Sequence, residues 1–362
     1  MGKRARLPTL MESRPFPIML NTPHITDFPR TGSPEEQLRF LLRYAILAPS
    51  SHNSQPWLWQ IEGDEVTLRA DFKRAMPNLD PNHRELIMSC GAALQHLCLA
   101  IRAFGYAALV HTLPDRSQPD LLARVRLSAP RPATANDELL FRFITKRHTH
   151  RGHFEDKPLP CELLNALQQQ CEFEGAALHF AQTSEDRDSI VGLVERGDLI
   201  QNRDPGSRRD IADWIAPTEN RPDGIPASAL GLGDLMGHIA PLAQRYLDRG
   251  EVIAARDKKI ASNAPVLAVL STSEDTPQGW LAAGQALGRL LLRARAEGVW
   301  ASFFSQPIQV NEPWFQLRHM TGVHHFPQLV FRLGYADPVA ATPRRSVDEV
   351  TTVVPIGEPI EA

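Results

Sequence analysis

Two polar segments contain the residue types that could bind a ligand. The first, APSSHNSQPW at residues 48–57, places hydroxyl, imidazole and amide side chains between two prolines. Such groups can form hydrogen bonds along the edge of a flat heterocycle, and prolines restrict the backbone in a way that suits a preorganised site. A helix-to-strand turn whose polar side chains satisfy its own backbone has the same composition. The candidate binding residues of this loop are Pro49, Ser50, Ser51, His52, Asn53 and Gln55.

The second segment, KRHTHRGHF at residues 146–154, is basic. Arg147, Thr149 and Arg151 alternate, so an extended backbone would place two guanidinium groups and a hydroxyl on one side. Guanidinium forks match phosphate oxygens, and charge-assisted hydrogen bonds are strong. The pattern indicates a phosphate site, with a solvated basic turn as the alternative. Arg344 and Arg345, in TPRRSVDEV near the C-terminus, could return to the same phosphate.

The histidines of the basic segment allow a different interpretation. His148, His150 and His153 have a spacing that could ligate a metal ion. No Cys, Asp or Glu pattern nearby completes a ligand set, and residues 148 and 150 point away from the arginines if the segment is extended. A metal-dependent protein is therefore kept as a third functional class, although we expect no metal site.

Helices and strands on both sides of these segments must position them. Ser33, Pro34 and two following acids form a helix-start signal, and that helix stops before Pro49. The segment WLWQIEGDEVTLRAD alternates apolar and polar residues around EGDE, which predicts a hairpin. Further strands are expected in ARVRLSA, AALHFAQT, APVLAVLST and FPQLVFRLGYAD.

Two apolar helices, expected in ELIMSCGAALQHLCLAIRAFG and GWLAAGQALGRLLLRARAEG, repeat one another. The intervals from Gly91 to Gly105 and from Gly284 to Gly298 are both fourteen residues, at an offset of 193. Six identical residues pair at that offset: Ala93 with Ala286, Leu94 with Leu287, Leu97 with Leu290, Leu99 with Leu292, Arg102 with Arg295, and Ala103 with Ala296. Buried helices are generally rich in Leu and Ala, but the paired glycines favour a duplicated unit arranged as a pseudo-dimer.

The predicted organisation follows from this repeat. We expect an extended arm at 1–33, a first half at 34–133, a second half at 134–352 and a tail at 353–362. The second half contains a long helical segment with a Pro/Gly-rich break, at 203–260, which either folds as a lid or is a structural insertion.

Composition excludes several classes of protein. The 362 residues carry a net charge of −3, so nothing favours nucleic acid as a partner. No apolar run approaches the roughly 20 residues that span a bilayer. The four cysteines form no C-x-x-C pattern, which indicates reduced thiols and a cytoplasmic protein.

Taken together, these segments resemble the nitroreductase family, flavoproteins that hold FMN at a dimer interface. APSSHNSQPW resembles the loop that packs against the flavin from the neighbouring subunit. RHTHRGHF, followed by KPLP, resembles the Arg-x-Ser-x-Arg phosphate segment, with Thr149 in place of serine. FFSQPIQV, with Ser305 and Gln306, lies where the family lines the isoalloxazine edge, and TPRRSVDEV resembles the phosphate-contacting tail. The most similar branch is the Acg-like one, in which two units are fused in one chain.

The resemblance implies an α+β nitroreductase-like fold, duplicated internally, with a mostly antiparallel or mixed sheet in each half. Each half keeps one complementary part, so it implies a single FMN site between the phosphate segment of the second half and residues 49–53 of the first. NAD(P)H would reduce FMN, and flavin N5 would pass the electrons to a nitroaromatic or quinone, so no catalytic side chain is required. The alternative is a flavin-binding or flavin-storage protein, covered by the lid and with little turnover. We expect a monomer or weak homodimer without nucleic-acid or membrane partners.

Overall fold

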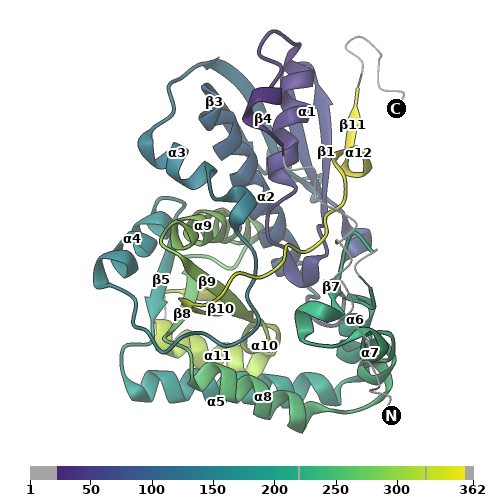
Figure 1. The fold of residues 1–362 in the computed structure, drawn as a ribbon, viewed down its shortest axis with the longest axis vertical. Helices are drawn as coiled ribbons and strands as arrows, with labels where there is room; N and C mark the ends of the chain where they lie inside the picture. Colours follow the sequence, from purple (N-terminus) through teal and green to yellow (C-terminus); the bar gives the residue numbers. More distant parts are fainter. Residues whose placement is uncertain (1–22, 219–220, 323, 355–362) are drawn as a thin grey trace, which may run out of the picture.

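The structure, a computed structural model, describes residues 23–218, 221–322 and 324–354 and contains two large sheets. Neighbouring strands in these sheets are antiparallel, apart from one parallel pair at an edge. Helices surround both sheets (Figure 1), so the predicted α+β class is confirmed. Residues 1–22 of the expected arm and 355–362 of the expected tail lie outside the described residues.

The first half begins with a capped helix. The Ser33 hydroxyl accepts a hydrogen bond from the Glu36 N–H, the Glu36 carboxylate accepts one from the Ser33 N–H, and Pro34 is the first helical residue. This capping box is the predicted helix start. The elements of this half are α1 (Pro34–Ala45), β1 (Trp57–Glu62), β2 (Glu65–Ala70), α2 (Arg84–Ala103), β3 (Tyr106–Thr112) and β4 (Leu121–Pro130).

The second half repeats this order of elements. It contains α4 (Cys161–Glu172), β5 (Ala176–Phe180), β8 (Val266–Thr272), α9 (Pro277–Ala296), β9 (Val299–Phe304) and β10 (Phe326–Tyr335). The sheet order β5-β8-β10-β9 matches β1-β2-β4-β3 of the first half, strand for strand. A short helix, α3 (Ala135–Phe141), connects the halves, and α10 (Gln306–Gln309) and α11 (Asn311–Thr321) fill the β9–β10 connection.

The long helices of the two halves cross at a pair of equivalent glycines. A Cβ atom added to Gly91 would lie 2.3 Å from the Leu281 carbonyl oxygen, and one added to Gly284 would lie 2.0 Å from the Met88 carbonyl oxygen. Residues 88 and 281 are themselves separated by the repeat offset of 193. The contact is thus symmetric in both glycines, and only residues without a side chain allow α2 and α9 to approach this closely. This geometry agrees with the predicted internal duplication.

The C-terminal segment crosses from the second half to the first (Figure 1). After β10 the chain runs to α12 (Val347–Val350) and β11 (Thr351–Val353), and β11 pairs in parallel with β1. The expected boundary of the second half at residue 352 therefore differs from the sheet topology, since the last strand completes the sheet of the first half.

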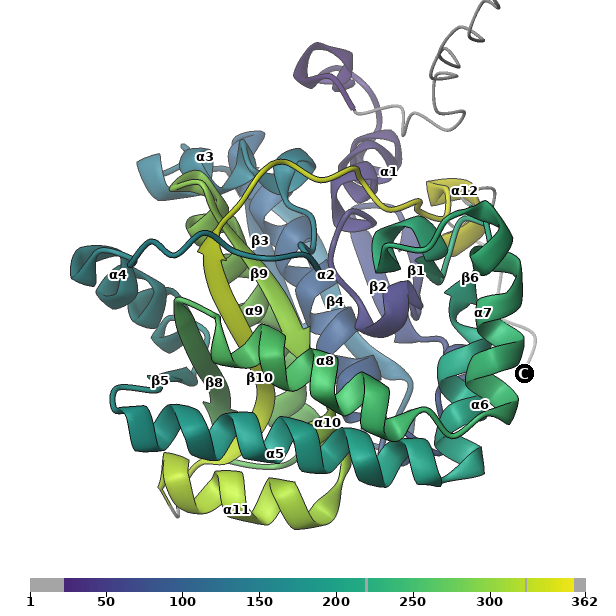
Figure 2. The same cartoon turned by 60° about the horizontal axis from the view of Figure 1, so that its bottom comes forward.

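A long helical segment separates β5 from β8. It spans residues 181–265, which we call the insertion, and is wider than the expected 203–260. Figure 2 shows α5 and α8 lying along one side of the molecule and α6 and α7 beside the first half. Its elements are α5 (Ser184–Arg203), α6 (Pro205–Asp213), β6 (Ile215–Ala216), β7 (Ile225–Pro226), α7 (Asp234–Tyr246) and α8 (Gly250–Ser262).

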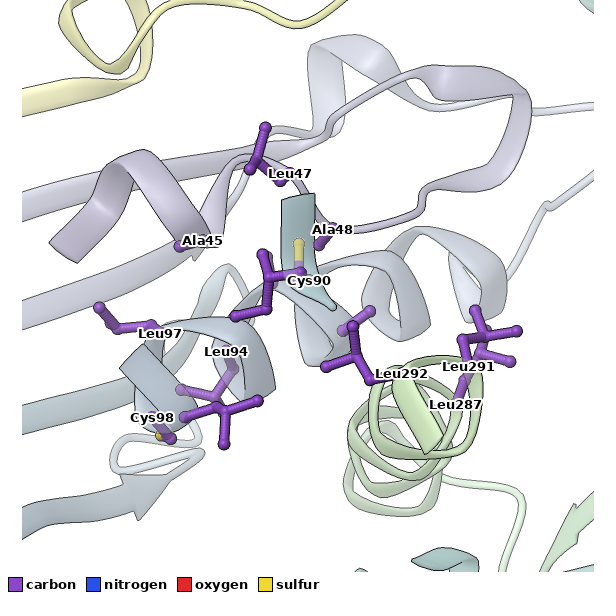
Figure 3. Close-up of a cluster of buried hydrophobic side chains, with 14 of the residues drawn as sticks. Ala45, Leu47, Ala48, Cys90, Leu94, Leu97, Cys98, Leu287, Leu291 and Leu292 are labelled. Carbon is purple, nitrogen blue, oxygen red and sulfur yellow. The ribbon is translucent and has the colours of Figure 1, made fainter. Parts of the chain in front are cut away.

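The main core lies between α1, α2 and α9 (Figure 3). Helix α2 is long and apolar enough to cross a membrane, but nearly all of it is buried inside the protein. All four cysteines are free. The residues labelled in the figure are Ala45, Leu47, Ala48, Cys90, Leu94, Leu97, Cys98, Leu287, Leu291 and Leu292. Because this core fixes residues 45–48, it also fixes the start of the polar loop that follows.

Candidate functional site

The polar loop between α1 and β1 has an unusual backbone. His52, Asn53 and Gln55 have φ angles of 50°, 56° and 50°, in the left-handed region that residues other than glycine rarely adopt. Each such residue costs free energy and persists only where surrounding contacts hold it. Strain concentrated in one loop is typical of a functional site.

Hydrogen bonds from three directions hold the loop. The Gln55 N–H donates to the Ser50 hydroxyl (3.0 Å), and the Gln55 amide donates to the Pro222 carbonyl of the insertion (2.8 Å). The Gln55 amide oxygen accepts from the Arg345 N–H at 2.8 Å. Gln55 is completely buried by these contacts, so its side chain fixes the loop instead of facing a ligand.

Asn53 connects the loop to the insertion and to the C-terminal segment. Its amide donates to the Gly224 carbonyl (3.0 Å), while its amide oxygen accepts from the Arg344 guanidinium (2.9 Å). Asp223, between these insertion residues, forms ion pairs with Arg74 and Arg221. The insertion of the second half therefore closes over the loop of the first half.

Three arginines gather beside the loop. Arg147 and Arg344 donate to the carbonyls of Leu47 and Ala48, at 3.3 Å in each case. Burial, the largest cause, and the charges of Arg147 and Arg151 lower the pKa of Arg344 to about 9. Burial lowers the pKa of Arg147 and of Arg151 to about 10. The proximity of three cations implies that the site is suited to an anion.

No carboxylate neutralises this cluster. Among the described residues, Arg147, Arg151 and Arg344 take part in no ion pair, and the Nε atoms of Arg147 and Arg344 are buried without a hydrogen-bond partner. Buried charges are normally paired, because the loss of hydration is costly. An anionic ligand would supply the missing partner.

The histidines around the cluster are neutral at pH 7. Burial, followed by the charge of Arg151, lowers the pKa of His52 to about 4. Burial and the arginine charges lower the pKa of His96 and of His148 to about 3. The arginines therefore carry the positive charge of the site alone.

The basic segment and the Ser305 segment share one sheet edge. Thr149 forms a parallel bridge with Ala301 in β9, and the His150 N–H donates to the Ala301 carbonyl at 3.0 Å. β9 then leads into Ser305 and α10. This pairing holds residues 147–151 extended and directs them along the strand that ends at the second predicted ligand-binding segment.

A buried carboxyl group joins the loop to α10. The Ser51 hydroxyl donates to Glu85, on the first turn of α2, and the Gln309 amide donates to the other carboxyl oxygen at 2.9 Å. Ser305 also donates a hydrogen bond to Glu85. Burial, and then the nearby Asp80 carboxylate, raise the pKa of Glu85 to about 7. Parts of both halves thus meet at one titratable group.

Comparison with known proteins identifies the family. No protein-family model matches the chain. The uncharacterized protein Rv3127 of Mycobacterium tuberculosis is 30% identical over 329 residues, covering 86% of this chain and 93% of the relative. The M. tuberculosis protein named "Putative NAD(P)H nitroreductase acg" is 26% identical over 332 residues, covering 89% of this chain and 97% of that protein. This chain belongs to the nitroreductase family, in its Acg-like branch.

A structural likeness has also been found. The crystal structure of the FMN-dependent nitroreductase NfnB from Mycobacterium smegmatis in complex with NADPH has a TM-score of 0.39 and 16% identity, and the match covers 59% of this chain and 97% of that chain.

The structure brings several of the predicted residues near one another. Arg147 and Arg344 contact the start of the loop, Arg344 also contacts Asn53, and Ser51 and Ser305 both contact Glu85. Arg345 instead contacts Gln55 and lies 4.0 Å from Asp71, outside the arginine cluster. The Gln306 side chain turns into the insertion, where its amide donates to Asp198 (2.8 Å) and Asp257 (3.2 Å). The side chains of Arg345 and Gln306 are thus held by other protein groups.

Glu85 is the site residue that the sequence did not reveal. It begins an apolar helix, where an acid is ordinary as a partner of the helix N-terminus. Its only signal is that the residues following it in ELIMSC are almost all apolar, which implies burial.

The structure does not bring the three histidines of the basic segment together as metal ligands. His148, His150 and His153 belong to no group of three potential metal ligands among the described residues. His150 lies between the rings of Phe154 and Trp300, with centroids at 5.5 and 5.8 Å, while His153 is exposed.

Proposed function

We propose that this chain binds one FMN and acts as an NAD(P)H-dependent oxidoreductase of the nitroreductase type. The observation that carries the proposal is the uncompensated cluster of Arg147, Arg151 and Arg344 beside a strained polar loop. Family membership supports it, since the acg protein is named as an NAD(P)H nitroreductase.

The residues present fit FMN. Its phosphate would lie against the three arginines and the Thr149 hydroxyl, where a dianion supplies the missing charge and accepts from the orphaned Nε groups. The ring would lie between residues 49–53 and the Ser305 segment. When bound, FMN would supply the redox chemistry, the transfer of a hydride from NAD(P)H to a nitroaromatic or quinone acceptor.

The protein residues contribute binding and orientation. The arginines fix the phosphate, and the strained loop presents the Ser51 hydroxyl and the His52 imidazole in a set geometry. Because Asn53 contacts the insertion and Arg344 together, closure of the insertion and binding of the phosphate are coupled through one side chain.

Titration of the purified protein with FMN tests this function. We expect saturation at one FMN per chain, a yellow protein, and loss of the colour when NADPH or NADH is added without oxygen. A stoichiometry of two per chain would contradict the single site, and absence of FMN binding would contradict the function.

A second candidate is a flavin-holding protein with little turnover. The contacts of Pro222 and Gly224 with the loop favour it, because an insertion that closes over the site can exclude substrate. Asp223→Asn would remove the ion pairs with Arg74 and Arg221 and loosen this cover.

The direction of the rate change separates the two candidates. A several-fold rise in quinone reduction for Asp223→Asn would favour the flavin-holding protein, and a fall would indicate that the cover completes the active site. Asp213→Asn is the matched control, since it breaks an ion pair with Arg245 within the insertion and leaves the ion pairs of Asp223 in place.

A further inference from the structure

A chain of polar side chains runs from the surface to the candidate site. A pocket opens beside the start of α2, and three of its rim residues, Pro81, Asn82 and Asn311, are exposed. Deeper in this pocket lie two carboxyl groups, Asp80 and Glu85, each only 5% exposed. The pocket therefore brings solvent to a buried acid that also contacts the polar loop.

The chain continues through two more hydrogen bonds. The Ser51 hydroxyl donates to Glu85 Oε2, and it lies 3.2 Å from His52 Nδ1. His52 in turn lies close enough to Arg151 for that charge to lower its pKa. Glu85, Ser51 and His52 thus join the pocket to an imidazole that lies near the arginine cluster.

We propose that Glu85, Ser51 and His52 form a proton relay from this pocket to the candidate site. The inference deepens the proposed function and rests on it. Two-electron reduction of a quinone consumes one hydride and one proton, so that NAD(P)H, a proton and the quinone give NAD(P)⁺ and the hydroquinone. The relay supplies this proton from solvent.

Each transfer in the relay balances. When Glu85 is protonated, the hydrogen bond reverses: the carboxyl group donates to Ser51 Oγ, and the rotated Ser51 hydroxyl donates to His52 Nδ1. Glu85 then passes its proton to Ser51 Oγ while the Ser51 proton moves to His52 Nδ1, which leaves Glu85 as a carboxylate. His52 then releases a proton from Nε2 to the acceptor in the site and is left neutral, protonated at Nδ1. A flip of the imidazole ring, which brings the unprotonated nitrogen back to Ser51, resets the relay. Solvent in the pocket protonates Glu85 again.

The surroundings of Glu85 suit this role. Burial, the largest cause, and the nearby Asp80 carboxylate oppose ionisation of Glu85, while Ser51, Ser305 and Arg84 favour it. Their balance leaves the Glu85 pKa near 7, so both protonation states are accessible at neutral pH. On the far side of Ser51, a His52 pKa of about 4 makes the imidazolium a ready donor. Burial raises the pKa of Asp80 itself, while hydrogen bonds from backbone N–H groups and the charges of Arg84 and His83 lower it.

Infrared spectroscopy of the FMN-free protein tests the hydrogen-bonded chain by itself. We expect the carbonyl stretch of a protonated carboxyl group to titrate near pH 7, to be absent in Glu85→Gln and to change frequency in Ser51→Ala. Asp80→Asn should move the titration to lower pH, because it removes a like charge. A band that titrates near 4, or that ignores Ser51→Ala, would overturn the relay.

The FMN-loaded protein tests proton delivery. In stopped-flow quinone reduction between pH 5.5 and 9, the wild-type rate should fall as pH rises through about 7, because Glu85 loses the proton that it donates. Glu85→Gln should be slower by about tenfold or more and lack this break. Ser89→Ala is the matched control: Ser89 accepts from the Ser51 N–H at 3.1 Å but lies outside the relay, so the break should persist.

The outcomes separate the relay from the proposed function. If the protein binds no FMN, the proposed function fails, while the infrared band still reports on the chain. If FMN binds with unchanged affinity and Glu85→Gln keeps the wild-type rate and break, the relay fails and the function stands.

Discussion

The two halves of the chain share one order of elements but differ in two connections. In the first half, residues 46–56 link α1 to β1, and a two-residue turn links β1 to β2. In the second half, only residues 173–175 link α4 to β5, whereas the 181–265 insertion links β5 to β8. Under the proposed function, the first half supplies the loop that lines the site and the second half supplies the segment that covers it. The duplicated unit would then form one asymmetric site.

The two long helices carry different side chains at one pair of equivalent positions, and this difference changes how buried charge is balanced in the two halves. His96 of α2 lies near the arginine cluster and is neutral, whereas its counterpart at offset 193 is Arg289 of α9. Arg289 is buried and forms an ion pair with Glu174 at 3.7 Å. Its guanidinium also donates a hydrogen bond to the Gln170 side chain and stacks over the Phe173 ring. The second half therefore pairs its buried cation internally, whereas the arginines near His96 have no carboxylate partner among the described residues.

The helix crossing gives the largest expected effect. Gly284→Ala should lower the free energy of unfolding by about 4 kcal/mol, because its Cβ would meet a backbone oxygen that cannot move independently. Gly91→Ala should cost a similar amount if the crossing is symmetric. Gly192→Ala, in α5 with open space around the added Cβ, should have no such cost. Urea unfolding measures all three, and a harmless Gly91→Ala would break the proposed symmetry.

The arginines of the two halves should respond differently to removal. Arg147→Ala with Arg151→Ala should weaken FMN binding by about a hundredfold or more, through the loss of charge-assisted bonds to the phosphate. Arg289→Ala should change the affinity by less than about threefold, since Arg289 already has its partner. Fluorescence titration with FMN measures both. Equal losses would mean that the phosphate assignment is wrong.

The internal ion pair of the second half should matter for stability alone. Glu174→Gln leaves Arg289 without its carboxylate, and we expect a loss of about 2 kcal/mol in the free energy of unfolding. The cost stays moderate because Gln170 and the Phe173 ring still contact the guanidinium. FMN affinity should be unchanged. If Glu174→Gln is as stable as the wild type, the ion pair with Glu174 does not stabilise the buried Arg289 charge.

Local patterns made much of this molecule predictable. The capping residues of α1, the alternation that forms the β1–β2 hairpin and the paired glycines of α2 and α9 each act over a few residues, so their sequence carries the information. The side-chain directions of Arg345 and Gln306 depend on partners far along the chain. Gln306 turns toward Asp198 and Asp257 because the insertion brings two buried acids to it.

Glu85 illustrates the same limit within the site. Its position on an apolar helix predicts burial, but its role follows from Ser51 and Gln309, which lie 34 residues before and 224 residues after it. No local pattern contains such a pairing. The sequence thus predicts which segments meet more reliably than which atoms do.

The smallest expected effect concerns pH. In the FMN-free protein the Arg344 pKa is about 9, because burial and two neighbouring cations favour its neutral form. A bound phosphate favours the charged form, so FMN binding takes up a proton once the pH exceeds that pKa. Raising the pH from 8 to 10 should then weaken FMN binding by about tenfold, as linkage to one proton requires.

Arg344→Ala provides the control for this dependence, because it retains the pH response of FMN itself and of the other two arginines. Its affinity at pH 8 should be lower than that of the wild type, and its further loss up to pH 10 should be smaller. Parallel curves for the two proteins would place Arg344 outside the charge that binds the phosphate. The anion site would then consist of Arg147 and Arg151, both contributed by the extended segment beside β9. The C-terminal segment would contribute only strand β11 to the first sheet and no residue to the anion site.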